Sequence, residues 1–432
     1  MNPHKYVFLT GIWFRNKKIF DCYNYLKQSE SYDIDQLHNI QFTRLQGLLK
    51  NAYTNSVYYK NKFESCGYNP NELQSLEDLK DVPITSKEEV LSNSELIQVN
   101  DCGEKLFFSE TSGSTGRPLV FYRNMEWDAW VNAAVMRGYS WHKVDPWEKN
   151  GYLWGYNIAP DKQLKIRILD YLQNRFRLFS YKSEDIEKFV SKLEKADYLG
   201  GYSSMLYEVA KRVNANHSKP TFNLKMIKGT SEKIYDVYQD EVKKAFGRKI
   251  ISEYGSAESG IIAFECAYGN MHINMETVIV EEINNEIIVT NLVSKSFPII
   301  RYKLGDYVKI DISIKCACGM SHKIIKEVTG RIGSVIYGKE SQYPSLTLYY
   351  VFKNMAIASN VVINYQVVQN EKGTIDVYIE NGFNTKHHGL MLKEFNKYFK
   401  NDVEINVQYN VERRDYSSKK KDFISNIRSE IQ

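Results

Sequence analysis

The stretch Ser109-Glu110-Thr111-Ser112-Gly113-Ser114-Thr115-Gly116-Arg117-Pro118-Leu119 alternates hydroxyl side chains with glycines and ends in one cation. Glycines let a backbone turn tightly and bring N–H groups close to an anion, while hydroxyls and a guanidinium add donors. The stretch therefore favours a loop that holds the phosphates of a nucleotide. It is not a Walker loop, because Pro118 stands five residues after Gly113, where that motif has Gly-Lys. A solvated Ser/Thr/Gly loop is the alternative at this point.

Four more motifs follow in order along the chain. Ser252–Glu258 lies beyond the apolar pair Ile250-Ile251, and Tyr302–Asp306 follows an extended run that ends at Arg301. Gly330-Arg331 comes next, and a lysine cluster lies near the C-terminus. Over nearly the whole chain, this order and spacing resemble the acyl-adenylate-forming superfamily, which includes acyl-CoA synthetases and amino-acid adenylation domains.

Within that superfamily, the chain most resembles the phenylacetate-CoA ligase-like branch, and in it the CapK-type subgroup associated with capsular polysaccharide biosynthesis. The segments that carry this resemblance are Gly201-Tyr202-Ser203-Ser204, Thr230-Ser231-Glu232, Phe264-Glu265-Cys266 and Pro298-Ile299-Ile300-Arg301-Tyr302.

Length and composition indicate an ordinary globular chain of more than one domain. The 432 residues exceed the size at which single cores stop growing, so we expect two unequal domains. A net charge of +5, from 57 basic and 52 acidic residues, is too diffuse to indicate a nucleic-acid partner. The isolated Cys22, Cys66 and Cys102 are typical of free thiols in a cytoplasmic protein.

The apolar run 6–14 is too short to span a bilayer. We expect it to pack against the fold, with contact at a membrane surface as the alternative. Farther on, helical spacing at 36–66, 184–196 and 203–215 alternates with short strands that end near residues 153 and 201. Alternation of this kind predicts a layered α/β organisation.

Residues 272–328 change to short β-type runs separated by Asn, Gly or Asp, which favours an antiparallel β subdomain. The chain beyond 335 is expected to form an α+β module with helices at 345–357 and 387–399. We therefore predict an α/β fold with a large adenylation domain, 1–332, that combines layered α/β sheets with the small β subdomain. A small mobile α+β lid domain, 333–432, would follow.

The resemblance implies roles for particular residues. Glu258 would bind Mg²⁺, a hard cation that prefers carboxylate and phosphate oxygens. Tyr254, next to Gly255, would stack on adenine, and Ser231-Glu232 would line the adenine pocket. The β- and γ-phosphates of ATP would be held by Thr111, Ser112, Gly113, Ser114, Thr115, Gly116 and Arg117.

In the same comparison, Asp306 would accept hydrogen bonds from the ribose hydroxyls, and Arg331 would contact ribose or phosphate. The pocket for the acid is expected to be lined by Trp154, Gly155, Tyr202 and Ser203, although aromatic residues of a core would have the same appearance.

Residues 417–425 resemble the closing Ser-Gly-Lys motif of the superfamily, which makes Lys419 the catalytic lysine between the substrate carboxylate and the α-phosphate. The chain departs from the motif at Ser418, and a solvated basic tail is the alternative. It also departs at the hinge, where Gly333 and Ser334 replace a usual Asp-Asp. Glycine can still absorb a rotation there.

Three cysteines and a histidine have the composition of a closed tetrahedral zinc site. Cys266 precedes His272 by six residues, and Cys316 precedes Cys318 by two. His322 competes with His272 as the fourth ligand, and a hairpin tip with free thiols is the alternative to a metal. We expect a structural zinc that staples the β subdomain, with no open position for catalysis.

The predicted function is ATP-dependent ligation. A carboxylic acid and Mg²⁺-ATP would form an acyl-adenylate, and CoA, an amine or a hydroxyl would then displace AMP, in capsule or O-antigen polysaccharide biosynthesis. The partners would be a small-molecule carboxylic acid and an acceptor thiol or amine. The rival prediction is a degenerate member that binds nucleotide or a partner without turnover, which the altered hinge and Ser418 favour.

Overall fold

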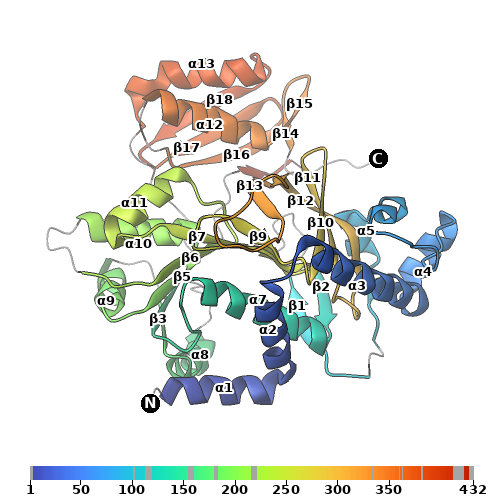
Figure 1. Cartoon of the computed structure of the whole chain (residues 1–432). Coiled ribbons are helices and arrows are strands. Elements are labelled where there is room, and N and C mark those ends of the chain that lie inside the picture. Colours follow the sequence, from blue (N-terminus) through green and yellow to red (C-terminus); the bar gives the residue numbers. More distant parts are fainter. Residues whose placement is uncertain are drawn as a thin grey trace. The chain divides into compact units, whose positions relative to one another are not determined.

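The structure is a computed structural model of the whole chain (Figure 1). It describes residues 3–100, 103–111, 119–153, 160–179, 183–215, 221–331, 335–359, 361, 363–380, 383–411 and 423–427. The chain divides into two compact units, the first made of Met1–Leu304 with Val308–Val328 and the second of Gly305–Tyr307 with Thr329–Gln432. The predicted hinge residues 332–334 lie outside the described set.

The chain begins with helices that cap themselves through local side chains. The helical spacing at 36–66 is confirmed by α3 (Ile34–Asn55) and α4 (Val57–Ser65), and Asp33 and Gln36 form a capping box at the start of α3. Ser86 and Glu89 form a second capping box at the start of α5. The first helices are α1 (Pro3–Asn16), α2 (Lys18–Ser29), α3 (Ile34–Asn55), α4 (Val57–Ser65), α5 (Lys87–Ser92) and α6 (Ser94–Ile97).

An eleven-stranded sheet forms the centre of the first unit, in the order β10-β11-β12-β13-β9-β8-β7-β6-β5-β3-β4. Neighbours within the segment β7-β6-β5-β3-β4 pair in parallel. These five strands are β3 (Asn150–Leu153), β4 (Arg175–Arg177), β5 (Tyr198–Tyr202), β6 (Met226–Thr230) and β7 (Ile250–Ser256).

The antiparallel strands that the sequence predicted are present, and they continue this same sheet. The connection is the antiparallel pair β7–β8, which is followed by the antiparallel pairs β8–β9 and β9–β13. The strands are β8 (Gly260–Glu265), β9 (Met271–Ile273), β10 (Val278–Ile283), β11 (Glu286–Asn291), β12 (Ile299–Asp311) and β13 (Ile324–Arg331).

Helices cover both faces of the parallel half, which is why its central strands β3, β5 and β6 are largely buried. On one face, apolar residues of α9 (Ser183–Leu193), α10 (Ser203–Ala215) and α11 (Asp236–Phe246) form a core with Leu199 and Ile227 of the sheet. The helices predicted at 184–196 and 203–215 are thus confirmed. Helix α7 (Met125–Trp141) packs on the other face, and the helix between β3 and β4 is α8 (Pro160–Leu172).

The second unit is a four-stranded sheet, ordered β18-β17-β16-β19, with its own core. Phe352 of α12 stacks on Tyr365 of β16 with ring centroids 3.6 Å apart. The helices predicted at 345–357 and 387–399 are confirmed as α12 and α13. The unit contains β14 (Val335–Tyr337), β15 (Gln342–Pro344), α12 (Leu346–Ser359), β16 (Tyr365–Glu371), β17 (Thr374–Ile379), α13 (His388–Phe399), β18 (Glu404–Tyr409) and β19 (Phe423–Ser425).

The N-terminal apolar run, which was expected to pack against the fold, does so only in part. It forms α1, in which Ile12 is buried but Tyr6, Val7, Trp13 and Phe14 are exposed. Packing against the fold therefore uses one side of the helix only. Among the described residues, no helix is long and apolar enough to cross a bilayer.

Candidate functional site

The parallel strands bring the predicted site segments to one edge of the sheet. Leu153 pairs with Gly201, Tyr202 with Thr230, and Thr230 with Glu253. The carboxyl ends of β3, β5, β6 and β7 therefore lie side by side. The segments that follow these ends are the ones that the sequence singled out.

The strand order also has a switch point at this edge. From β3 the chain goes to β4 on one side, and it returns to β5 on the other side of β3 before continuing to β6 and β7. In open α/β sheets, ligands bind outside the carboxyl ends of the strands at such a point. Tyr202 ends β5 there, and the predicted pocket residues Trp154 and Gly155 follow β3 but lie outside the described residues.

Small residues keep this edge closely packed. A Cβ atom at Gly201 would lie 2.5 Å from the Cβ of Leu153, and one at Gly229 would lie 2.7 Å from the Oγ of Ser203. Both distances are too short for a side chain, so these glycines are required by the packing of neighbouring strands and of α10.

The predicted adenine segment contacts the predicted pocket segment directly. The Glu232 side chain accepts a hydrogen bond from the backbone N–H of Ser204 at 2.9 Å, and the Ser203 hydroxyl donates to the carbonyl of Glu232 at 3.3 Å. Ser203 is fully buried. Burial, together with Glu232 and Tyr152, raises the pKa of Tyr202 to about 12, so this phenol stays protonated at neutral pH.

Ser231 has a left-handed backbone, with φ +64°. Non-glycine residues in this region are uncommon and are concentrated in binding sites and turns. Here the conformation reverses the chain directly after β6, so that the carboxylate of the next residue can reach the N-terminus of α10.

Lys228 of β6 and Glu253 of β7 form a buried ion pair near this edge of the sheet. The sequence patterns did not predict it. Nζ of Lys228 is 2.7 Å from Oε2 of Glu253, and both side chains are 9% exposed. Burial disfavours the charged lysine, but Glu253 outweighs it and raises the pKa of Lys228. The available signal was a lone charge inside the apolar strand β6.

Tyr254 and Gly255 lie on β7 at a register shift in the β7–β8 ladder. A Cβ atom at Gly255 would lie 2.2 Å from the carbonyl oxygen of Gly260, so only glycine fits. Tyr254 is half-buried. Glu258 follows in the turn, is 6% exposed, and accepts a hydrogen bond from the Tyr302 hydroxyl at 3.3 Å. It therefore offers a carboxylate at the carboxyl end of β7.

Thr111 closes the base of the predicted phosphate loop. It follows β1 (Phe107–Glu110), which pairs with β2 (Val120–Arg123) in an antiparallel hairpin. Its Oγ1 accepts from the N–H of Leu119 at 2.9 Å, and its own N–H donates to the carbonyl of Leu119. Outside the described residues lie the rest of the loop and the predicted catalytic lysine: Ser112, Gly113, Ser114, Thr115, Gly116, Arg117 and Lys419.

The structure gives the strand positions of Asp306 and Arg331 but does not test their predicted roles. Asp306 lies within β12, directly after Gly305, which has φ +82°. Arg331 ends β13, and its side chain is outside the described set. Their predicted contacts with ribose and phosphate stay predictions.

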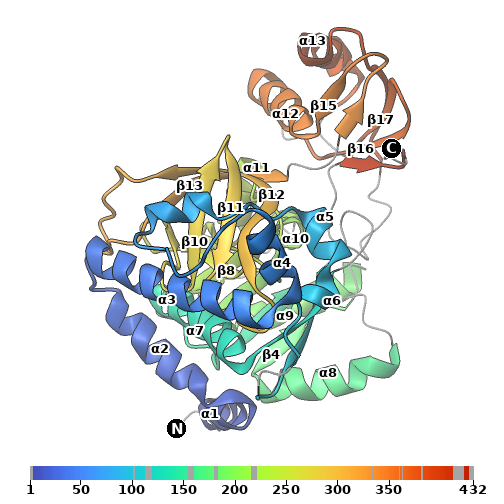
Figure 2. The same ribbon diagram turned by 90° about the vertical axis from the view of Figure 1, so that its right-hand side faces the viewer.

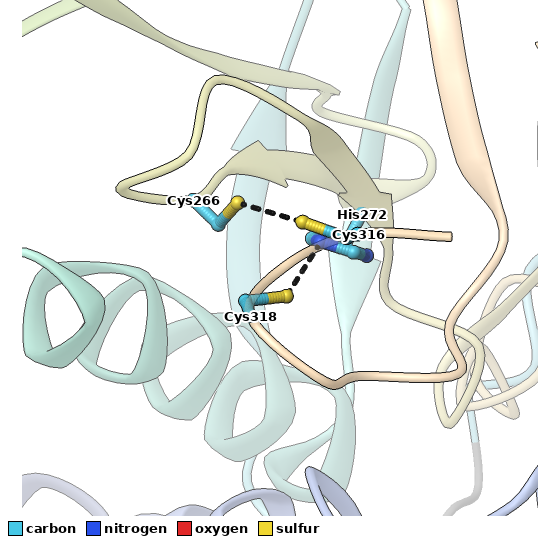
Figure 3. A group of neighbouring side chains, drawn as sticks. All are labelled: Cys266, His272, Cys316 and Cys318. Atoms are coloured by element: carbon cyan, nitrogen blue, oxygen red, sulfur yellow. Dashed lines mark hydrogen bonds between the residues drawn. The ribbon is translucent and has the colours of Figure 1, made fainter. Parts of the chain in front are cut away.

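The four predicted metal ligands converge at one end of the antiparallel strands (Figure 3). The ligand atoms of Cys266, His272, Cys316 and Cys318 all lie within 4.8 Å of one another. The sulfurs of Cys266 and Cys316 are 3.6 Å apart, far longer than a disulfide bond but close to the ~3.8 Å that tetrahedral Zn–S bonds imply. Nε2 of His272 is 3.2 Å from the Cys318 sulfur.

The histidine that faces the thiols is His272. Its Nδ1 lies 3.2 Å from the carbonyl of His322, which suits an N–H donor there and leaves the Nε2 lone pair toward the sulfurs. Burial lowers the pKa of His272 to about 4, so the ring is neutral, as a metal ligand must be. His322, the competing candidate, instead directs its Nε2 to Glu276 at 2.9 Å.

Glu276 connects this region to the N-terminal helices through a buried network. Its carboxylate is fully buried and pairs with the Arg137 guanidinium of α7 at 2.6 Å. It also accepts from the Ser29 hydroxyl of α2, while Arg137 donates to the side chain of Asn274. The loop beside the thiols is thereby joined to α2 and α7.

Comparisons with known proteins agree with this geometry. No protein-family model matches the chain. The structure is similar to the solved structure of 2-hydroxyisobutyryl-CoA ligase in the postadenylation state in complex with R3-HIB-AMP. The two superpose over 93% of this chain and 92% of that chain, with a TM-score of 0.71 and 16% sequence identity. The chain therefore has the fold of the acyl-adenylate-forming ligases.

Sequence matches are consistent with this class. The protein CapK of Staphylococcus aureus is 25% identical over 362 residues, which are 81% of this chain and 79% of CapK. The phenylacetate-coenzyme A ligase of Escherichia coli (strain K12) is 30% identical over 131 residues, 30% of each chain. The resemblance expected from the sequence motifs is confirmed.

Proposed function

We propose that this protein is an ATP-dependent ligase that activates a carboxylic acid as an acyl-adenylate and transfers the acyl group to an acceptor. The observation that carries the proposal is the convergence of the predicted adenine and acid segments at the switch point of the sheet, where Glu232 bonds to the start of α10. The fold match and the resemblance to CapK and phenylacetate-coenzyme A ligase support it.

The chemistry follows from what such a site must do. A carboxylate oxygen of the acid attacks the α-phosphorus of ATP, and the bond to pyrophosphate breaks. Two anions approach each other in this step, so cationic groups are needed to offset their repulsion. We assign Lys419 and the loop 111–117 to that task. Glu258, a buried carboxylate at the carboxyl end of β7, would hold Mg²⁺ on the phosphates.

In the second step a nucleophile of the acceptor attacks the acyl carbonyl, AMP leaves, and the acceptor loses a proton. CoA is the acceptor that the resemblance to acyl-CoA ligases favours, and an amine or a sugar hydroxyl is the one that a capsule or O-antigen pathway favours. We place the reaction in the cytoplasm, where ATP and CoA are available.

The test is pyrophosphate release from ATP and Mg²⁺ with a panel of carboxylates that includes amino acids and sugar acids. We expect acid-dependent release with at least one of them, and loss of most of that release in Glu258→Gln, which keeps the shape of the side chain but removes the charge. Mass spectrometry of the products with CoA, amines or sugars then identifies the acceptor. If calorimetry detects ATP binding but no acid leads to AMP formation, the rival prediction is favoured, that of a degenerate member that binds nucleotide without turnover.

We also propose that Cys266, His272, Cys316 and Cys318 hold a structural Zn²⁺. The four ligands would fill its coordination sphere, so the ion would join the loop after β12 to β8 and β9 rather than act on a substrate. About one equivalent of metal is expected in freshly purified protein. Cys318→Ser should lose both metal and thermal stability.

The control for this experiment is Cys66→Ser, because Cys66 is an exposed thiol far from the cluster in sequence. It should retain metal and stability. Elemental analysis that finds no metal in either the wild-type protein or this control would remove the zinc proposal without affecting the ligase proposal.

A further inference from the structure

Exposed apolar side chains are concentrated on two helices of the first unit. Four of them lie on α1 and five on α8, whereas most other described elements expose one or none. Trp13 is 59% exposed and Phe14 76% on α1, and Leu164 is 70% and Tyr171 74% on α8. Single exposed apolar residues need no explanation, but a contiguous set marks an interaction surface.

Helices α1 and α8 run in different directions and meet where the N-terminal end of α1 approaches the C-terminal end of α8, as the two perpendicular views of Figures 1 and 2 show. The ring of His4 on α1 is 6.2 Å from the ring of Tyr171, and its Nδ1 is 3.5 Å from the carbonyl oxygen of Leu172 on α8. The exposed apolar side chains of the two helices therefore adjoin at this contact, and we call the two sets together the α1–α8 surface.

Helical spacing gathers these side chains into stripes. Tyr6 and Trp13 are seven residues apart on α1, and Leu164, Ile168 and Leu172 recur every fourth residue on α8. Residues at such spacings share one face of a helix. Because these stripes point away from the core, they do not stabilise the fold through burial.

Charge decides which occupant suits the surface. Helix α1 contains no Asp or Glu, and of its two cations Lys5 is exposed, whereas Arg15 pairs with Asp128 of α7 at 2.7 Å. On α8, Lys165 and Arg167 are exposed, while Asp170 is buried and paired with Arg177 at 2.8 Å. The surface thus combines aromatic and aliphatic side chains with exposed cations.

A second copy of the chain would fit this surface poorly. A twofold interface brings the same patch of both copies together, and among the described side chains of α1 and α8 no exposed acid is present to pair with Lys165 and Arg167. An anionic bilayer fits both features. Aromatic rings prefer the boundary between headgroups and acyl chains, and lysine and arginine pair with the headgroups.

We propose that the α1–α8 surface binds the surface of an anionic membrane, with both helices lying along the interface and Trp13 and Phe14 inserted between the lipid headgroups. For residues 6–14, this proposal adopts the alternative that the sequence left open, contact at a membrane surface. The inference does not depend on the proposed ligase activity, because it concerns a different part of the first unit.

The test is co-sedimentation of the full chain with vesicles at low salt. Vesicles of phosphatidylcholine with phosphatidylglycerol should bind the protein, and vesicles of phosphatidylcholine alone should bind it far less. The double variant Trp13→Ser/Phe14→Ser should reduce the partition coefficient at least about tenfold, because two large apolar side chains no longer leave water. Lys165→Glu/Arg167→Glu should abolish the preference for anionic vesicles.

The matched control is Ile312→Ser. Ile312 is 82% exposed but lies in the loop after β12, so its loss should leave vesicle binding unchanged. Circular dichroism verifies that each variant is folded. Equal binding by the wild type and Trp13→Ser/Phe14→Ser, or no binding to anionic vesicles, overturns the proposal. A wild-type dimer in sedimentation velocity that this double variant converts to monomer would assign the surface to a second copy instead.

Discussion

Replacing Arg137 with methionine tests whether the buried network stabilises the first unit. Arg137 is 1% exposed, and its guanidinium lies 2.6 and 3.1 Å from the two carboxylate oxygens of Glu276, which is fully buried. Methionine keeps the apolar stem but leaves the carboxylate without its cation. Breaking a buried pair in this way costs about 3–5 kcal/mol.

The pH dependence follows from the same contacts. Burial opposes ionisation of Glu276, but Arg137 and His322 outweigh burial and hold its pKa well below the ordinary value of 4.5. A depressed carboxyl pKa stabilises the folded state above about pH 4.5, and this stabilisation is lost as the pH falls toward the folded-state pKa. Without Arg137 burial dominates and the pKa rises. The difference in free energy of unfolding between wild type and Arg137→Met should therefore shrink from pH 7 to pH 5.

Urea unfolding followed by tryptophan fluorescence is a suitable assay, since all six tryptophans lie within residues 1–304 of the first unit. The control is Lys295→Ala, which removes an exposed pair with Glu126 whose side chains are 49% and 34% exposed. Exposed pairs contribute only about 0–1 kcal/mol. If Arg137→Met costs no more than Lys295→Ala at pH 7, the reasoning about the buried network is refuted.

Two further predictions concern catalysis and packing. Lys419→Ala should slow acyl-adenylate formation by several orders of magnitude but leave the reaction of supplied acyl-adenylate intact. Lys420→Ala should have little effect on either step, and single-turnover kinetics measures both. If Lys420→Ala were instead the slow variant, the alignment of the lysine motif would be wrong by one residue. Gly138→Ala should destabilise the first unit by about 1–3 kcal/mol, because the new Cβ would lie 2.4 Å from the Phe264 ring. Gly47→Ala on α3 has open space around the new Cβ and should stabilise the unit by up to about 1 kcal/mol. Equal urea midpoints for the two variants would contradict both expectations.

Local features of the fold could be predicted because they depend on neighbours in sequence. The capping box of Ser86 and Glu89 spans three residues, and the spacing that predicted α10 repeats every turn of one helix. The thiol pair Cys316-x-Cys318 has the same local character. The order of the motifs further indicated the resemblance to the acyl-adenylate-forming superfamily.

The sequence by itself therefore determined local elements, the fold class and a set of candidate residues, but not which distant groups meet. Only the strand order of the sheet places Glu232 at the start of α10, selects His272 over His322 beside the thiols, and pairs Lys228 with Glu253. Tertiary packing likewise decides that one side of α1 is exposed. These contacts join segments tens of residues apart, and their free energies depend on burial and on pairing between strands, neither of which a local pattern of residues specifies.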